Sequence, residues 1–139
     1  SEDEPHEQKE ATMHKLVRKN YEKEVSGKEA VILFTSPLCK LCEELKIVMQ
    51  ITSEILSGKG IGFYWYDVSQ NEHPPGIPSI DELPTVYYIG EDGYQLYEGN
   101  ENVDSVLKFV WKNSKTVTAI PDYDKNAISQ RISKEKSTN

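Results

Sequence analysis

The sequence predicts an α/β fold with a central mixed β-sheet and helices on both of its faces. A continuously apolar run, Val31 to Phe34, has the length and composition of a strand covered on both sides. Apolar residues then recur at three- and four-residue steps from Leu41 to Leu56, which is the period of an amphipathic helix. Two later strand-like runs are joined by the turn residues 91–93, which indicates a hairpin.

The composition is that of one acidic domain with polar ends. The chain has 139 residues, a formal net charge of −7 and 37% hydrophobic residues. Nucleic acid is not expected as a partner, because phosphate binding needs clustered Lys and Arg. No apolar run approaches the roughly 20 residues that a membrane span needs. We expect a disordered acidic lead-in at 1–11, a folded domain at 12–115 and a polar tail or linker at 116–139.

The elements before the apolar strand are short. Residues 13–17 alternate loosely between apolar and polar side chains and predict an edge strand. Asn20 can cap a short helix over residues 21–25 that ends near Gly27. A helix between two strands favours a parallel strand pair with a right-handed crossover.

The longest predicted helix follows the apolar strand and ends at Gly58. Its apolar stripe contains Leu41, Leu45, Val48, Met49, Thr52, Ile55 and Leu56. Residues 61–68 are rich in aromatic and β-branched side chains and predict a strand that ends at Asp67, before an irregular loop at 70–80. The hairpin strands are 86–89 and 94–97, and the last amphipathic helix carries Val103, Val106, Leu107, Val110 and Trp111.

The two cysteines of the chain, Cys39 and Cys42, stand where the apolar strand passes into the long helix. Two thiols in C-x-x-C spacing at such a junction are the layout of a dithiol/disulfide redox site. Cys39 would lie at the helix N-terminus, and Lys40 beside it adds a cation; both should lower the pKa of the Cys39 thiol. Cys42, one turn inside the helix, would be the less exposed thiol.

Two other interpretations of the cysteine pair remain open. The pair could be a buried structural pair or an inert disulfide at a degraded site. It could also be half of a zinc site, but zinc needs two further ligands, and the three histidines are scattered along the chain at His6, His14 and His73.

Four segments carry a family pattern: 31–42, 67–71, 83–85, and 97–99 with the helix behind it. Over about residues 12–115 they resemble the thioredoxin fold, most closely the catalytic-type domains of the protein disulfide isomerase family. The resemblance implies a cis peptide bond before Pro84 that faces the sulfurs. It also implies that Leu83 and Pro84 form a backbone edge for an incoming peptide.

The chain departs from that family pattern around the cysteines. Leu38 stands where the family usually has an aromatic residue, and Leu33 where it commonly buries an acid that relays a proton to the second thiol. Asn100 stands where isomerase-type domains carry an arginine. The dipeptide between the cysteines, Lys40-Leu41, is neither Gly-Pro nor Gly-His. The two cysteines and the proline segment are present, but the residues that usually adjust the rate of exchange in this family are replaced.

The resemblance implies a thiol–disulfide oxidoreductase domain of protein disulfide isomerase type, slow or specialised, with Cys39 as nucleophile and Cys42 as resolving thiol. Its partners would be cysteine-containing polypeptides or partner oxidoreductases, with no metal or organic cofactor. The alternative is a weakly catalytic or non-catalytic thioredoxin-fold module that binds protein partners or unfolded chains. We expect a domain of a larger protein in the endoplasmic reticulum lumen or secretory pathway, with the cytoplasm as the alternative.

Overall fold

A computed structural model describes residues 1–6 and 10–138 and contains one five-stranded β-sheet. Its strands are β1 (Met13–Leu16), β2 (Glu29–Thr35), β3 (Ile61–Asp67), β4 (Thr85–Gly90) and β5 (Gly93–Leu96). The spatial order is β1-β3-β2-β4-β5. The first three strands in that order run parallel, and β4 and β5 add antiparallel pairs. The predicted mixed sheet, with β1 at its edge and β4–β5 as a hairpin, is confirmed.

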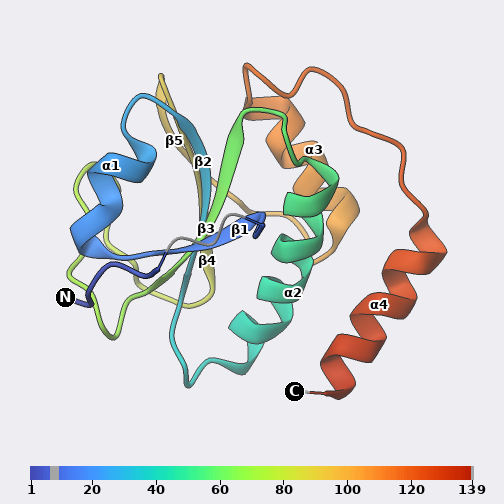
Figure 1. The fold of residues 1–139 in the computed structure, drawn as a ribbon, viewed down its shortest axis with the longest axis horizontal. Helices are drawn as coiled ribbons and strands as arrows, with labels where there is room; N and C mark the ends of the chain where they lie inside the picture. The colour runs from blue at the N-terminus through green and yellow to red at the C-terminus, as the bar shows by residue number, and fades with distance from the viewer. Residues whose placement is uncertain (7–9, 139) are drawn as a thin grey trace.

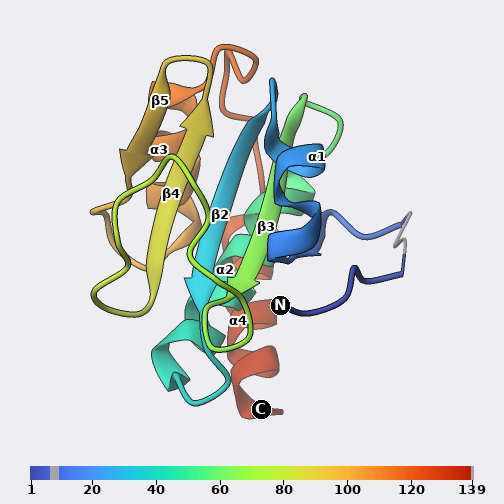
Figure 2. The same cartoon turned by 90° about the vertical axis from the view of Figure 1, so that its left-hand side faces the viewer.

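Helices cover both faces of this sheet. They are α1 (Tyr21–Val25, after a 3-10 turn at Arg18–Asn20), α2 (Lys40–Ile55), α3 (Val103–Asn113) and α4 (Lys125–Ser137). α1 lies on one face and α2 and α3 on the other, with α4 outside α2 (Figure 1). The long loop from β3 to β4 covers the α1 face beside that short helix (Figure 2). Within the described ranges, no helix is long and apolar enough to cross a membrane.

β2 is the central strand, and its alternating side chains divide the core into two clusters. Ile32 and Phe34 face α1, where Tyr66 and Tyr87 join them. Val31 and Leu33 face α2, and their cluster includes Leu45, Val48, Met49, Phe63, Val106, Leu107 and Val110. Because both sides of β2 are buried, every residue from Ala30 to Thr35 had to be apolar or small and polar, which is the continuous run seen in the sequence.

Three details of the helices differ from the sequence expectations. Asn20 precedes α1 but does not cap it, because its side-chain oxygen accepts a hydrogen bond from the Val17 N–H (2.9 Å). Leu41, in the first turn of α2, is 55% exposed and does not join the core. Trp111 is 50% exposed, and its indole N–H donates to the Thr118 carbonyl oxygen (3.3 Å) instead of packing into the core.

The segment 116–139 contains a helix that the sequence did not predict. α4 is capped by Asp124, whose carboxylate accepts a hydrogen bond from the Ala127 N–H (3.1 Å). Two half-buried isoleucines, Ile128 and Ile132, pack against the α2-side core. Only two apolar side chains of α4 reach the core, so the apolar stripe by which a helix is recognised in a sequence is too sparse here.

The lead-in is held by ion pairs as far as it is described. Glu2, Asp3 and Glu4 pair in order with Lys15 (2.5 Å), Lys19 (2.8 Å) and Lys23 (2.8 Å). Residues 7–9 lie outside the described part of the chain. Disorder of residues 1–11 stays a prediction.

Replacing Arg131 with methionine should loosen α4. The Arg131 guanidinium holds both carboxylate oxygens of Glu54 on α2, at 2.5 and 2.8 Å, and this hydrogen bonding lowers the pKa of the Glu54 carboxyl from its usual 4.5. Both side chains are partly exposed, so the pair should contribute about 1 kcal/mol or less to stability.

That contribution should be present above the unfolded-state pKa of Glu54 and disappear as the pH falls below it. Urea unfolding of Arg131→Met, with Lys134→Met as an exposed control on the same helix, measures both effects. A variant as stable as the wild type at neutral pH would show that the ion pair does not hold α4.

Candidate active site

A tight turn carries the chain from β2 to the first cysteine. The Cys39 N–H donates to the Ser36 carbonyl oxygen (3.1 Å), and the Leu38 N–H donates to the Ser36 hydroxyl (3.3 Å). Pro37 occupies the second position of this turn, where its fixed φ is favoured. The turn leaves the Leu38 side chain 97% exposed beside the cysteine.

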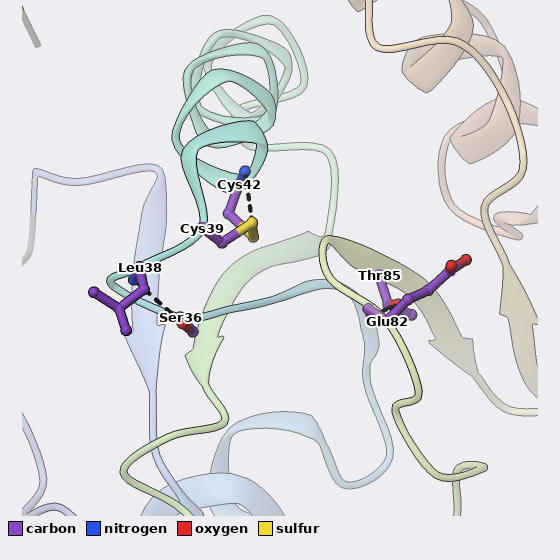
Figure 3. Close-up of a disulfide and its surroundings, with 6 residues drawn as sticks. All are labelled: Ser36, Leu38, Cys39, Cys42, Glu82 and Thr85. Atoms are coloured by element: carbon purple, nitrogen blue, oxygen red, sulfur yellow. Dashed lines mark hydrogen bonds between the residues drawn. A yellow bond between two sulfur atoms is a disulfide. The ribbon is translucent and has the colours of Figure 1, made fainter.

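Cys39 and Cys42 form a disulfide at the N-terminus of α2, with their Cα atoms 5.2 Å apart (Figure 3). Cys39 is the N-cap of the helix, and its Sγ accepts a hydrogen bond from the Cys42 N–H at 3.1 Å. Cys39 is partly exposed, whereas Cys42 is 0% exposed. An incoming sulfur therefore meets Cys39 first, and the helix N-terminus is built to stabilise a negative charge on that atom.

The segment before β4 lies opposite the disulfide. The Leu83–Pro84 peptide bond is cis. Thr85, the next residue, pairs with Phe34 in the strand register, which places it beside the end of β2 from which the cysteine turn leaves. Its hydroxyl donates to the Glu82 carbonyl oxygen (2.6 Å), and Figure 3 shows both residues across from the sulfurs. The fold thus brings residues 82–85 to the same end of the sheet as the cysteine pair.

The interior behind the disulfide is apolar. Leu33 is 0% exposed and pairs with Trp65 on one side and Val86 on the other. Because paired residues in adjacent strands share a face of the sheet, these three side chains lie under α2. Leu33 carries no group that can take up or release a proton, so a proton from Cys42 cannot be relayed through this position.

A cation lies close to this apolar region. The Lys46 ammonium sits 3.7 Å from the centroid of the Trp65 ring, and burial lowers the pKa of that ammonium group. The helical period of the sequence places Lys46 among the solvent-facing polar residues of α2, so Lys46 was not predicted to be near the cysteine pair. The available signal was its spacing of four from Cys42, which puts the two residues on one strip of the helix.

The remaining residues singled out in the sequence lie apart from the sulfurs or at the surface. Lys40 is exposed in the first turn of α2. Asn100 is exposed, and its carbonyl oxygen accepts a hydrogen bond from the Tyr97 hydroxyl. His14 lies in β1, and the His73 ring lies 2.9 Å from the Ile77 carbonyl oxygen in the irregular loop. In the described part of the chain, no three His, Cys, Asp or Glu side chains come together as a metal site.

Comparisons with known proteins agree with this architecture. The family model described as Thioredoxin matches residues 12–112. The J-Trx1 fragment of ERdj5 superposes with a TM-score of 0.67 at 18% identity, over 78% of this chain and 53% of that fragment. The zinc-bound form of human ERp44 superposes with a TM-score of 0.63 at 16% identity, over 72% of this chain and 31% of that protein.

A third structure covers a similar share of the chain. Chloroplastic thioredoxin z superposes with a TM-score of 0.62 at 19% identity, over 72% of this chain and 92% of its own. No curated protein sequence matches the chain. The chain spans about half of the ERdj5 fragment and about a third of ERp44, so these likenesses concern the fold of one domain.

Proposed function

The chain belongs to the thioredoxin family, and on that premise we propose that it is a thiol–disulfide oxidoreductase domain of protein disulfide isomerase type. One observation carries the proposal. The partly exposed Cys39 sulfur caps α2 and is disulfide-bonded to the fully buried Cys42. This arrangement gives an accessible attacking sulfur and a shielded resolving one, which disulfide exchange requires.

The exchange runs in two steps. In the reduced protein the Cys39 thiolate attacks one sulfur of a substrate disulfide; a new S–S bond forms, and the other substrate sulfur leaves as a thiolate. Cys42 then loses its proton to solvent and attacks Cys39, which forms the Cys39–Cys42 disulfide and releases the first substrate sulfur as a thiolate. Two electrons pass from the protein to the substrate. The reverse sequence oxidises a substrate dithiol.

The substrate chain would lie along the residues before β4. The cis Leu83–Pro84 bond directly precedes Thr85, which pairs with Phe34 at the end of β2 from which the cysteine turn leaves, and the backbone there can pair with an extended peptide. We propose cysteine-containing polypeptides or partner oxidoreductases as the substrates, and a role as one domain of a larger protein. The endoplasmic reticulum lumen or secretory pathway is the proposed location, with the cytoplasm second.

Insulin reduction tests the proposal directly. The protein, recycled by a small thiol reductant, should accelerate the precipitation of insulin chains beyond the rate of the reductant alone. Cysteine pairs that act on polypeptides do this, whereas a structural disulfide does not. A rate equal to that of the reductant alone would overturn the proposal.

The alternative function is a binding module that grips partners and turns over little. The observation that favours it is the apolar side chain of Leu33, 0% exposed, behind the pair. Binding of an unfolded polypeptide without cysteines distinguishes the two functions. A binding module should hold it with the same affinity when Cys39 and Cys42 are both replaced by serine.

Replacing Leu38 with serine should weaken the recognition of apolar substrates. The side chain is 97% exposed next to the attacking sulfur, and Leu41 is 55% exposed on the other side of Cys39, so a bound peptide contacts both. Burying one leucine against a substrate contributes about 1.5 kcal/mol, which corresponds to roughly tenfold in KM. Leu96→Ser on β5 is the exposed control. Unchanged KM values in Leu38→Ser and Leu41→Ser would show that the leucines lie outside the binding surface.

A further inference from the structure

We propose that Lys46 is a partly buried cation that shifts the redox equilibrium of the Cys39–Cys42 pair toward the dithiol. The inference rests on the proposed function, since it concerns the same pair of sulfurs. In this proposal Lys46 is a positioning residue that acts on the thiols through its charge. Its ammonium lies over Trp65, the strand partner of Leu33, whose own side chain carries no charge.

The geometry of α2 places the Lys46 side chain over the turn that holds Cys42. Residues four apart on a helix are neighbours, with Cβ atoms about 5–6 Å apart. Side chains of helical residues lean toward the helix N-terminus, so that of Lys46 extends toward Cys42 and the start of the helix. Cys42 is fully buried, and Lys46 is only partly exposed.

Trp65 fixes where the ammonium lies. Its ring centroid is 3.7 Å from the Lys46 Nζ, and Trp65 pairs with Leu33 in the strand register. Leu33 in turn lies on the strand that leads into the cysteine turn. The charge is therefore held against the sheet beside α2, in partly buried surroundings. A charge there acts through a medium of lower dielectric than water, so its effect on a nearby sulfur is stronger.

Two other charged groups, Glu43 and Lys15, lie near Lys46. Glu43 on α2 is exposed and raises the pKa of Lys46, while burial has the larger, opposite effect. Lys15 on β1 reaches the same ring at 5.2 Å, but its ammonium is paired with Glu2 at 2.5 Å. Glu2 thus largely neutralises Lys15. Among the described residues, no acid forms an ion pair with Lys46.

The expected consequence follows from the charges of the two redox states. The disulfide is neutral, whereas the reduced pair carries a thiolate, so a nearby cation stabilises the reduced state. Lys46 therefore makes the pair a stronger oxidant. Leu33 cannot exchange a proton with the pair, whereas Lys46 acts on the pair by its charge.

Equilibration with glutathione tests the inference without any turnover assay. Lys46→Met keeps the length and apolar stem of the side chain and removes the charge. We expect its dithiol–disulfide equilibrium to move about fivefold toward the disulfide, which corresponds to about 20 mV for a two-electron couple. Lys46→Arg should keep the wild-type equilibrium, and Lys46→Gln should follow the methionine variant. Lys112→Met, an exposed lysine on α3, is the matched control.

The outcomes separate this inference from the proposed function. Equal equilibrium constants for the wild type, Lys46→Met and Lys46→Gln would overturn it, even if the protein reduces insulin. A shift of the same size in Lys112→Met would also overturn it, because net charge would then be the cause. If the wild type fails to reduce insulin but Lys46→Met still shifts the equilibrium, the proposed function fails and the inference stands.

Discussion

Replacing Cys39 with serine should lower the rate of insulin reduction to that of the small thiol reductant alone. Cys39 is the sulfur that a substrate reaches, because Cys42 is 0% exposed behind it. A serine hydroxyl at the helix N-terminus is not ionised near neutral pH and does not attack disulfides. The remaining thiol of Cys42 is buried and cannot replace it. This is the largest change in activity that a single substitution should produce.

Cys42→Ser is the matched variant. It keeps the attacking thiol and removes the resolving one, so the mixed disulfide between Cys39 and the substrate should accumulate. Mass spectrometry of the non-reduced protein, incubated with a substrate peptide, detects the added mass. Wild-type insulin reduction by Cys39→Ser, or the absence of a mixed disulfide with Cys42→Ser, would contradict the assignment of roles.

Replacing Leu33 with glutamate should change activity and stability in opposite directions. The introduced carboxyl group would lie under α2, among the apolar side chains that pack on β2, and could exchange a proton with Cys42. We expect turnover to rise several-fold. Burial of a carboxyl group in an apolar core costs about 3 kcal/mol of the free energy of unfolding.

The pH dependence identifies the cause of that loss. Burial raises the pKa of the introduced carboxyl above its unfolded value, so the folded state retains a proton that the unfolded state releases. The variant should therefore be closest to wild-type stability at acidic pH and lose stability as the pH rises. Leu33→Gln buries a polar group of the same size that cannot carry the proton, and its turnover should stay at the wild-type level. Unchanged turnover in the glutamate variant would show that proton transfer does not limit the reaction.

The sequence predicted the parts of the fold whose signals are local. β2 is buried on both faces, so its apolar run could not be missed, and α2 presents a regular apolar stripe to the sheet. The cysteine spacing and the Pro84 segment then placed the site at one end of the sheet. The match to the thioredoxin family confirms the predicted fold.

The parts that the sequence missed depend on contacts between distant segments. Lys46 looks like any solvent-facing lysine until Trp65 of β3 is placed under it. α4 is a polar helix whose Arg131 binds Glu54 of α2, and such a contact leaves no periodic pattern in the sequence. Trp111 and Leu41 fit an apolar stripe by spacing, but they are 50% and 55% exposed.

The division of the core by β2 affects which substitutions near the cysteines the fold can tolerate during evolution. Side chains that face α1 and those that face α2 leave the same strand in opposite directions, into two separate clusters. Substitutions in one cluster share no packing partners with those in the other, so their effects on stability should be nearly independent. The surroundings of the cysteines can therefore vary while the α1 face preserves the fold. Leu33, in the cluster that faces α2, is a substitution of this kind: it alters the surroundings of the cysteines without changing the α1 face.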